Sequence, residues 1–496
     1  MVHFGSHQVD ELLRGGPGAT VYLIGVGGCG VSGLGHLLLD LGHGVAGSDL
    51  AINEECRALM ARGAEIQAGH SAAHLAAARP ALVVYSSAIQ RDNPQLEIAR
   101  KLGIPVVRRA VLLAALVHRQ RGVCVAGMHG KTTTTALLAF VLERLNARPS
   151  YAVGALVPQL GCHARFSLPT PAASVQPLFV FEADESDGTL QEFHPERAIL
   201  LNVDEEHLDH YANFEGVCAT FGRFAAQTRG PLLFCADDVR LAELVAGHPR
   251  AISYGFAPRA DYRLALKPPG ISAPGLNAFE VWHAGGKLGD FTTALLGEKN
   301  VSNAGAVIAM SHQLGYSAAE IAPALAAFTG AARRQERLFA DERFQLFEDY
   351  GHHPAEIEAT LHALKSLRPR RLLVAFQPHR FTRTQFLLRQ FATCFSAADH
   401  LWLTEVYAAS EPEIAGVNGR RLAEAVRQTG QELDYVSTLT ELPAAVGAAM
   451  LPGDLVLFIG AGDITRAARQ LADRLRRKNG TNALGEQKGQ QAELNF

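Results

Sequence analysis

Short apolar runs alternate with longer segments of mixed polarity along the first 119 residues. Runs at residues 20–28, 44–50, 81–89 and 104–109 have strand length, and segments 31–42 and 110–119 have the apolar content of helices. Strands that alternate with helices predict a parallel, doubly wound α/β sheet of Rossmann-like form. A small charged turn follows at 119–122, and we place a boundary there, so the first predicted domain is 1–119.

The same alternation continues through a second predicted domain, residues 120–330. Its predicted strands are 123–127, 177–186, 197–211, 231–238 and 248–255, and its helices begin at Lys131 and cover 300–315 and 317–328. Proline and glycine are scattered through 267–289, which we interpret as a hairpin-rich insertion.

A third α/β pattern covers residues 331–478. Its predicted strands are 344–351, 370–378, 400–407 and 453–462, and its predicted helices are 353–367, 383–395 and 463–478. The last segment, 479–496, is polar and contains glycine, so we expect it to be disordered. The pattern therefore predicts three α/β domains followed by a tail.

Composition narrows the class of protein. The 496 residues carry a net charge of −3, which gives no reason to expect a nucleic-acid or membrane partner. The seven cysteines include no Cys-x-x-Cys pair, which fits a reducing cytoplasm rather than a disulfide framework or a zinc cluster. Neither a signal peptide nor a bilayer-spanning apolar run is predicted.

A glycine loop in the second domain, GMHGKTT at Gly127–Thr133, joins a predicted strand to a helix. Backbone N–H groups at a helix start attract anions, and Lys131 adds a full positive charge. The hydroxyl of Thr132 suits Mg²⁺. Val125 occupies the position of the first glycine in the usual phosphate loop, so this would be a shortened loop. A plain turn remains the alternative.

The first domain has its own glycine loop, with Gly25, Gly27 and Gly30 in G-x-G-x-x-G spacing after a strand. Asp49 ends the next strand, where dinucleotide-binding folds place a ribose contact. The pattern predicts a site for a diphosphate-linked nucleotide. The pattern does not identify the nucleotide, which could be NAD or another diphosphate-linked nucleotide. The alternative is that the glycines only allow the strand and the helix to pack closely.

Carboxylates follow two predicted strands of the second domain. Glu182, Asp184 and Glu185 end one strand, and His207 and Asp209 end the next. That edge of an open α/β sheet is where ligands bind, and Mg²⁺ prefers oxygen ligands that it shares with phosphates. Glu182 is the natural metal candidate. A histidine such as His207, taken alone, is more often a surface or core residue than a ligand, but the phosphate loop in the same domain favours ligation.

Histidines and arginines gather at two strand ends of the third domain. The cluster contains Asp349, Tyr350, His352, His353, His379, Arg380 and Arg383. These side chains suit an anion or carboxylate site, with solvated turns as the alternative. The segment RRQER at 333–337 could be a charged linker.

Several segments together resemble the Mur ligase family, in that family's order. They are GVGGCGVSGLG, GMHGKTTTTA, FEADESDG, NVDEEHLDHY, NVSNA, RRQE, EDYGHHPAEI, FQPHRFTRT and EVYAASE, spread from about residue 20 to about 465. The resemblance is strongest to the branch that joins L-alanine to UDP-N-acetylmuramate in peptidoglycan synthesis. It implies a UDP-binding Rossmann-like domain, a central ATPase-like phosphate-loop domain and a C-terminal Rossmann-like domain, in a cytoplasmic monomer or homodimer.

The resemblance also implies a role for each matched residue, with ATP and Mg²⁺ as cofactors. The UDP-sugar side comprises Gly25, Gly27, Gly28, Gly30, Ser48, Asp49 and Ser86. The ATP side comprises Gly127, Met128, His129, Gly130, Lys131, Thr132 and Thr133, with Asn300 and Asn303 at adenine and Asp349 at ribose. Thr132 and Glu182 would bind one Mg²⁺, and His207 a second. Tyr350, His352, Arg380 and Arg383 would line the site for L-alanine and the reacting carboxylate.

Four residues depart from the family pattern. Met128 replaces the usual threonine, which removes a hydroxyl but keeps the backbone N–H, and Lys299 replaces histidine beside the adenine pocket. Gly351 replaces a common alanine, which we expect to be harmless, and Gln335 replaces an apolar residue. The segment 211–229 contains no lysine, and residue 186 is serine; both features favour the L-alanine branch over its sister enzymes.

The implied chemistry is activation of the muramate carboxylate by ATP as an acyl phosphate, which the amine of L-alanine then attacks. Exclusion of water would require domain closure, and we predict a hinge near residues 330–334. Alternatives are a ligase for glycine, serine or a peptide, a nucleotide-binding member without catalysis, and a nicotinamide oxidoreductase.

Overall fold

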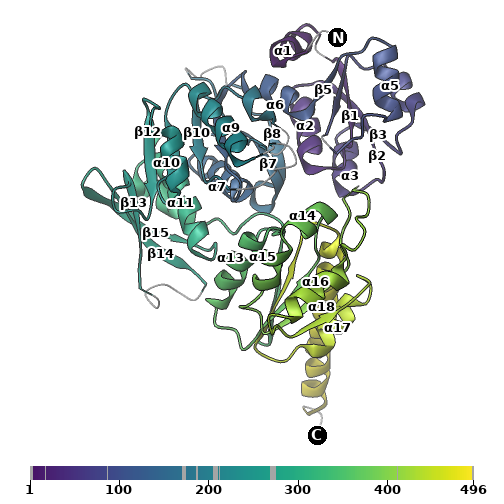
Figure 1. Cartoon of the computed structure of the whole chain (residues 1–496), viewed down its shortest axis with the longest axis vertical. Helices are drawn as coiled ribbons and strands as arrows, with labels where there is room; N and C mark the ends of the chain where they lie inside the picture. The colour runs from purple at the N-terminus through teal and green to yellow at the C-terminus, as the bar shows by residue number, and fades with distance from the viewer. Residues whose placement is uncertain are drawn as a thin grey trace. The chain divides into compact units, whose positions relative to one another are not determined.

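The computed structural model has a three-domain α/β architecture built on three sheets (Figure 1). It describes residues 4–493 except 17, 87, 170–174, 186–187, 205–210, 212, 269–274 and 410, with side chains up to residue 478. His207, Asp209 and Ser186 therefore lie outside the described residues. The predicted α/β fold class is confirmed.

The first sheet has five parallel strands in the order β3-β2-β1-β4-β5. They are β1 (Thr20–Ile24), β2 (Gly44–Asp49), β3 (Glu65–Ala68), β4 (Leu82–Tyr85) and β5 (Val106–Arg108). Its helices are α1 (Ser6–Arg14), α2 (Cys29–Asp40), α3 (Glu54–Ala61), α4 (Ala72–Ala78), α5 (Pro94–Lys101) and α6 (Arg109–Val117). The strand order reverses between β1 and β4, the place where such sheets bind nucleotides.

The second sheet has ten strands in the order β15-β14-β13-β12-β11-β10-β6-β9-β7-β8. The parallel strands run from β12 (Ala251–Gly255) through β11 (Leu232–Cys235), β10 (Arg197–Leu200), β6 (Arg121–Ala126) and β9 (Leu178–Glu182) to β7 (Ser150–Val157). At one edge β13 (Tyr262–Leu266) pairs in parallel with β12 and leads into the antiparallel hairpin β14 (Asn277–His283) and β15 (Gly286–Thr293). At the other edge β7 pairs antiparallel with β8 (Cys162–Arg165).

Helices α7 (Lys131–Arg144), α9 (Phe214–Gln227), α10 (Val239–Val245), α11 (Glu298–Gln313) and α12 (Ala318–Ala326) accompany this sheet. Helix α7 is buried from Thr132 to Leu142, which explains why this stretch contains only threonine and apolar residues and no charged face. The predicted insertion at 267–289 is confirmed as a hairpin where β14 turns into β15 through Ala284 and Gly285, both with positive φ.

The third sheet has six strands in the order β16-β17-β21-β18-β19-β20. They are β16 (Glu336–Ala340), β17 (Phe344–Asp349), β18 (Leu372–Phe376), β19 (His400–Leu403), β20 (Leu433–Tyr435) and β21 (Asp454–Ile459), and only β16 is antiparallel to its neighbour. Its helices are α13 (Pro354–Lys365), α14 (Phe381–Phe386), α15 (Leu388–Thr393), α16 (Gly419–Arg427), α17 (Leu442–Ala449) and α18 (Ile464–Glu493).

Two predictions for this third domain need correction. The single helix predicted at 383–395 is wrong, because the chain forms α14 and α15 with a break at Leu387. The segment 333–337 is not simply a linker, because β16 begins at Glu336. The side chains beyond Lys478 are not described, and disorder of 479–496 stays a prediction.

A continuous apolar core joins the first two sheets. Buried side chains of α2 and α6, such as Leu34 and Leu112, belong to the same cluster as Cys124 on β6 and Phe179 on β9. Contact density therefore divides the chain into two compact units rather than three, with the main boundary between Ala331 and Ala332. That boundary lies within the predicted hinge segment, while the hinge motion itself stays a prediction.

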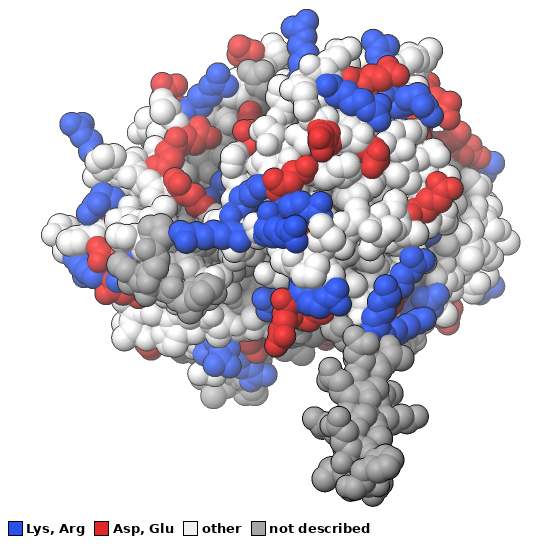
Figure 2. Space-filling model, turned by 90° about the horizontal axis from the view of Figure 1, so that it is seen from below, with Lys and Arg blue, Asp and Glu red and all other residues white. Residues whose placement is uncertain are grey.

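The face of the protein seen from below carries side chains of both charges (Figure 2). On the face in Figure 2, lysine and arginine side chains lie among aspartate and glutamate side chains, with uncharged surface between them. Among the described residues, no helix is long and apolar enough to cross a membrane. All seven cysteines are free thiols.

Candidate active site

The first glycine loop lies between β1 and α2, where the strand order of the first sheet reverses. Gly25 has a φ of 78°, which favours glycine, and its N–H donates to the carbonyl of Ser48 at 2.9 Å. The N–H of Gly27 donates to Oδ2 of Asp49 at 2.9 Å. Asp49 therefore fixes the loop, a role that the sequence interpretation had not given it.

Of the two serines predicted on the UDP-sugar side, Ser48 has a buried side chain and Ser86 lies beside the loop. Ser48 is fully buried, and its hydroxyl contacts Oε1 of Gln95 at 2.7 Å and Nδ1 of His70 at 3.0 Å. Its side chain thus faces the interior of the first sheet. Ser86 follows β4, and its Cβ is 3.9 Å from the point where a Cβ on Gly25 would lie, so it is beside the loop.

The second glycine loop, between β6 and α7, leaves no space for larger side chains. Gly127 and Gly130 have φ values of 141° and 86°. A Cβ on Gly127 would come 2.9 Å from Cβ of Leu201, and one on Gly130 would come 2.9 Å from Oδ1 of Asn303. The predicted adenine-side residue Asn303, far along the chain on α11, is thereby brought to the loop.

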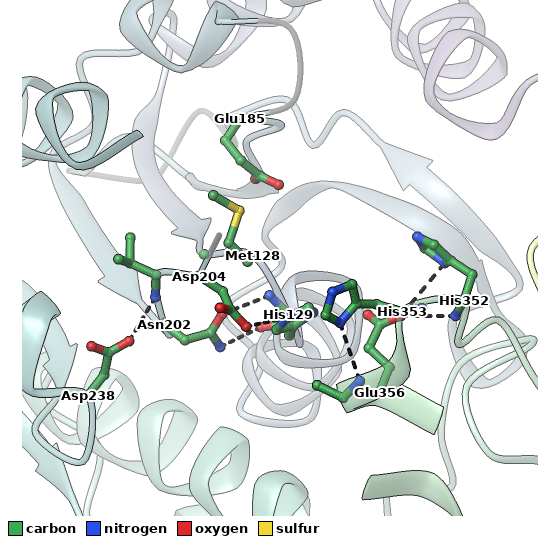
Figure 3. Close-up of polar contacts among 12 residues, drawn as sticks. Met128, His129, Glu185, Asn202, Asp204, Asp238, His352, His353 and Glu356 are labelled. Atoms are coloured by element: carbon green, nitrogen blue, oxygen red, sulfur yellow. Dashed lines mark hydrogen bonds and ion pairs between the residues drawn. The ribbon is translucent and has the colours of Figure 1, made fainter. Parts of the chain in front are cut away.

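Asn202, just after β10, secures this loop and was not singled out from the sequence. Its Oδ1 accepts from the N–H of His129 at 2.8 Å, and its Nδ2 donates to the carbonyl of His129 at 2.9 Å (Figure 3). Its own carbonyl accepts from the N–H of Met128 at 3.3 Å. The only available signal was a polar residue directly after a buried strand.

Lys131 starts α7 and is held over its own loop. Its Nζ donates to the carbonyls of Gly127 at 2.6 Å and Met128 at 3.1 Å, and pairs with the carboxylate of Glu185 at 2.8 Å. Burial opposes its charge, but the carboxylate of Glu185 and nearby acidic groups prevail and raise the pKa of Lys131. The ammonium is thus permanently charged at the helix N-terminus.

Thr132 and Glu182 adjoin Lys131 and form the candidate metal site. The hydroxyl of Thr132 donates to Oε2 of Glu182 at 2.8 Å. Gly154 on β7 makes room for this pair, because a Cβ there would lie 2.0 Å from Oε1 of Glu182. A carboxylate and a hydroxyl beside a phosphate loop are the hard oxygen donors that Mg²⁺ requires, so these residues fit the ion. Gly154 was not predicted.

An ion pair joins the neighbourhood of the first glycine loop to the segment that follows β9. Arg109 at the start of α6 pairs with Asp184, two residues beyond Glu182. The same guanidinium lies 3.0 Å from where a Cβ on Gly30 would be. Neither the sequence pattern nor the family resemblance identified Arg109.

Three other predicted nucleotide residues lie near α7 and α11. Thr133 is buried on α7. Nδ2 of Asn303 donates to Oδ1 of Asn300 at 3.1 Å, so both predicted asparagines share one face of α11. Lys299, which departs from the family pattern, is exposed.

Met128 packs into the apolar core joining the first two sheets and is 5% exposed. The backbone N–H that the substitution keeps donates to the carbonyl of Asn202. The change from threonine therefore adds core packing beneath the loop.

In the third domain, Asp349 ends β17 and is turned toward backbone. Its Oδ2 accepts from the N–H of Gln335 at 2.7 Å, and its Oδ1 accepts from the N–H of Gly351 at 2.7 Å. Burial raises its pKa to about 6. A Cβ on Gly351 would lie 2.9 Å from Oδ1 of Asp349, so glycine suits this site. Contact with ribose stays a prediction for Asp349.

Two of the predicted L-alanine residues of this domain, Tyr350 and His352, meet edge to face, with ring centroids 5.5 Å apart. Nδ1 of His352 is 3.1 Å from the carbonyl of Tyr350, which can only accept, so Nδ1 donates and Nε2 carries the lone pair. Burial lowers the pKa of His352 to about 3, so its ring is neutral at pH 7 and a weak base. The N–H groups of His352 and His353 donate to Glu356 (Figure 3).

The two predicted arginines flank His379. NH1 of Arg383 is 3.2 Å from Nδ1 of His379, whose ring stacks on Tyr407. Arg380 has a positive φ of 70°, and its N–H donates to the carbonyl of Tyr407 at 2.8 Å. The strand ends thus bring His352, His379 and Arg383 together, as the sequence cluster predicted.

Comparison with known proteins shows which family has this architecture. The model of the Mur ligase family catalytic domain matches residues 20–121, that of the Mur ligase middle domain 125–311, and that of the Mur ligase glutamate ligase domain 333–462. The UDP-N-acetylmuramate–L-alanine ligase of Sorangium cellulosum is 40% identical over 467 residues, 92% of this chain and 97% of that protein. Its counterpart in Myxococcus xanthus is 39% identical over 475 residues, 95% of this chain and 98% of that protein.

A solved structure agrees with these relatives. The UDP-N-acetylmuramate–alanine ligase of Thermotoga maritima is similar to this chain with a TM-score of 0.80 and 27% identity, covering 93% of this chain and 100% of that one.

Proposed function

Because the chain belongs to the Mur ligase family, we propose that it joins L-alanine to the carboxylate of UDP-N-acetylmuramate, with conversion of ATP to ADP and phosphate. This reaction belongs to peptidoglycan synthesis. The observation that carries the proposal is the charged Lys131 at the start of α7, beside the Thr132–Glu182 pair.

The reaction proceeds through two substitutions. A carboxylate oxygen of the muramate bonds to the γ-phosphorus of ATP while the bridging P–O bond breaks and ADP leaves. The amine of L-alanine then attacks the acyl carbon, loses a proton, and inorganic phosphate leaves. Most of the catalysis in such transfers comes from positioning and charge stabilisation.

The residues of the second glycine loop supply that stabilisation. The N–H groups at the start of α7, the α7 dipole and the ammonium of Lys131 would bind the phosphate oxygens. Mg²⁺ held by Thr132 and Glu182, and a second ion at His207, would neutralise charge on the phosphoryl group. Asn300 and Asn303 would face adenine.

The first glycine loop, with Gly25, Gly27, Gly28 and Gly30, would hold the uridine diphosphate at the N-terminus of α2, with Asp49 fixing the loop and Ser86 beside it. In the third domain, Arg380 and Arg383 would bind carboxylate or phosphate oxygens. The neutral His352 would accept a hydrogen bond from the amine through Nε2, and Tyr350 would line the same site. Asp349 would meet the ATP ribose.

The proposed compartment is the cytoplasm, because seven free thiols fit a reducing environment. A monomer or homodimer is proposed for the assembly.

Phosphate release tests the function. The full-length protein is mixed with ATP, Mg²⁺ and UDP-N-acetylmuramate, and then with L-alanine, glycine, L-serine or a muropeptide in separate reactions. Release fastest with L-alanine, and absent without an amino acid, is the expected result. A preference for a peptide would indicate a sister ligase, and no release with any acceptor would indicate a member without catalysis.

A further inference from the structure

Three side chains of metal-ligating types meet where the first two sheets pack together, and none of them belongs to the Thr132–Glu182 pair of the candidate active site. Cys29 begins α2, Glu55 lies on α3, and His163 lies on β8. One ligand atom from each, a sulfur, an oxygen and a nitrogen, lies within 4.8 Å of the other two. The three residues come from separate elements, so the fold rather than sequence proximity assembles them.

The histidine is held rigidly for such a role. His163 is 2% exposed, and its ring lies against Gly33 of α2, where an added Cβ would be 3.4 Å from the ring. Ser32 Oγ is 3.1 Å from its Nε2 and 3.1 Å from Oε2 of Glu55. Burial lowers the pKa of His163 to about 4, so the imidazole is neutral at pH 7, the form that binds metals.

The other two ligands can adjust. Cys29 and Glu55 are only partly buried, so their side chains can rotate toward the imidazole. Metal–ligand bonds of about 2.0–2.3 Å place tetrahedral donors roughly 3.3–3.8 Å apart, so approaches of about 1 Å suffice. Ser32 or a water can complete the fourth position.

The donor set selects the kind of metal. Thiolate, imidazole and carboxylate together suit Zn²⁺ and related transition ions, whereas Mg²⁺ takes oxygen donors. A bound cation also deprotonates its coordinating thiol, so the proton of Cys29 is released to solvent on binding.

We propose that Cys29, Glu55 and His163 form a Zn²⁺ site that ties α2 and α3 to β8. The ion joins the first glycine loop, which contains Cys29, to the edge of the second sheet. Its binding stabilises the packing of the two sheets.

Cobalt spectroscopy on the full-length protein tests the site. The protein is stripped with a chelator, kept reduced with a phosphine and supplied with excess Mg²⁺ to occupy oxygen sites. One equivalent of Co²⁺ is expected to give a thiolate-to-metal charge-transfer band that Zn²⁺ abolishes. Cys29→Ser should abolish the band, and His163→Gln should weaken binding about tenfold or more.

Cys162→Ser is the matched control, because Cys162 precedes His163 on β8 but lies outside the cluster. This variant should keep both the band and the rise in melting temperature that Zn²⁺ gives the unaltered protein. Glu55→Gln serves if Cys29→Ser fails to fold. A charge-transfer band that survives in Cys29→Ser, or no band in the unaltered protein, would overturn the proposal.

Discussion

The two glycine loops begin alike and are stabilised by opposite means. Each follows a buried parallel strand and leads into a helix, and positive φ occurs at Gly25 in the first loop and at Gly127 and Gly130 in the second. The first loop is tied by a carboxylate, Asp49, that accepts a loop N–H. The second is tied by a neutral amide, Asn202, and by the ammonium of Lys131.

This difference in charge matches a difference in task. A loop that only holds a diphosphate needs shape and backbone donors, and it contributes equally in the ground state and the transition state. A loop that serves phosphoryl transfer needs a fixed positive charge where negative charge develops. The experiments that separate the loops should therefore affect different kinetic constants.

Loss of the ammonium at the second loop should have the largest effect. Lys131→Ala is expected to lower kcat by about 10²–10³-fold, the scale for losing one electrostatic stabiliser. Phosphate release under saturating substrates measures it. Because this change leaves buried Glu185 without its counter-ion, Lys131→Ala with Glu185→Gln controls for the unpaired charge. Near-normal turnover in either variant would refute the role of Lys131.

Crowding the metal site should have the next largest effect. In Gly154→Ala the new Cβ would lie 2.0 Å from Oε1 of Glu182 and displace that carboxylate. The Mg²⁺ concentration for half-maximal rate is expected to rise about 10–100-fold. Gly222→Ala on α9, where an added Cβ meets nothing within 4 Å, is the control. An unchanged Mg²⁺ requirement would separate Glu182 from the metal.

Crowding the first loop should change binding rather than turnover. In Gly27→Ala the Cβ would lie 2.8 Å from Nδ2 of Asn53 and 3.0 Å from Asp49. The KM for UDP-N-acetylmuramate is expected to rise roughly tenfold with kcat within about twofold, the sign of lost uniform binding. Steady-state kinetics with Gly247→Ala as control decides this. A fall in kcat at unchanged KM would contradict the proposal that the first loop acts in binding and only the second loop acts in the transition state.

Restoring the family's threonine should matter least for activity. Met128→Thr is expected to change the rate by less than about twofold, because the side chain faces the core and the N–H already donates to Asn202. It should lower the free energy of unfolding by about 1–3 kcal/mol, because apolar contacts are lost and a hydroxyl is buried. Denaturant unfolding checks this against the volume-conserving Met128→Leu, and a large gain in rate would contradict it.

Local patterns predicted the elements on which the candidate site stands. Apolar strands ending in glycine or carboxylates identified both loops, Glu182 and the histidine cluster, because parallel strands bring such residues to one edge. Two strands at or next to a sheet edge were not predicted from the pattern. The edge strand β3 is mostly exposed, and β7, which lies beside the edge strand β8, contains Gly154 and a register irregularity, so neither shows a clear apolar run.

The residues that sequence reasoning missed act across long distances in the chain. Asn202 reaches the loop 73 positions earlier, and Arg109 meets Asp184, 75 positions later. Gly154 contributes through the absence of a side chain, which leaves space for the carboxylate of Glu182. No periodicity or spacing encodes such contacts, since they arise from how neighbouring strands and helices are placed.

The Arg109–Asp184 ion pair limits which substitutions the chain can accept at three positions. Its guanidinium touches the space beside Gly30 and the segment that carries Glu182, so a replacement at any of the three positions alters the other two. Residues 30, 109 and 184 should thus covary among related sequences, and a chimaera that exchanges the first sheet between distant relatives should need its matching partner at 184.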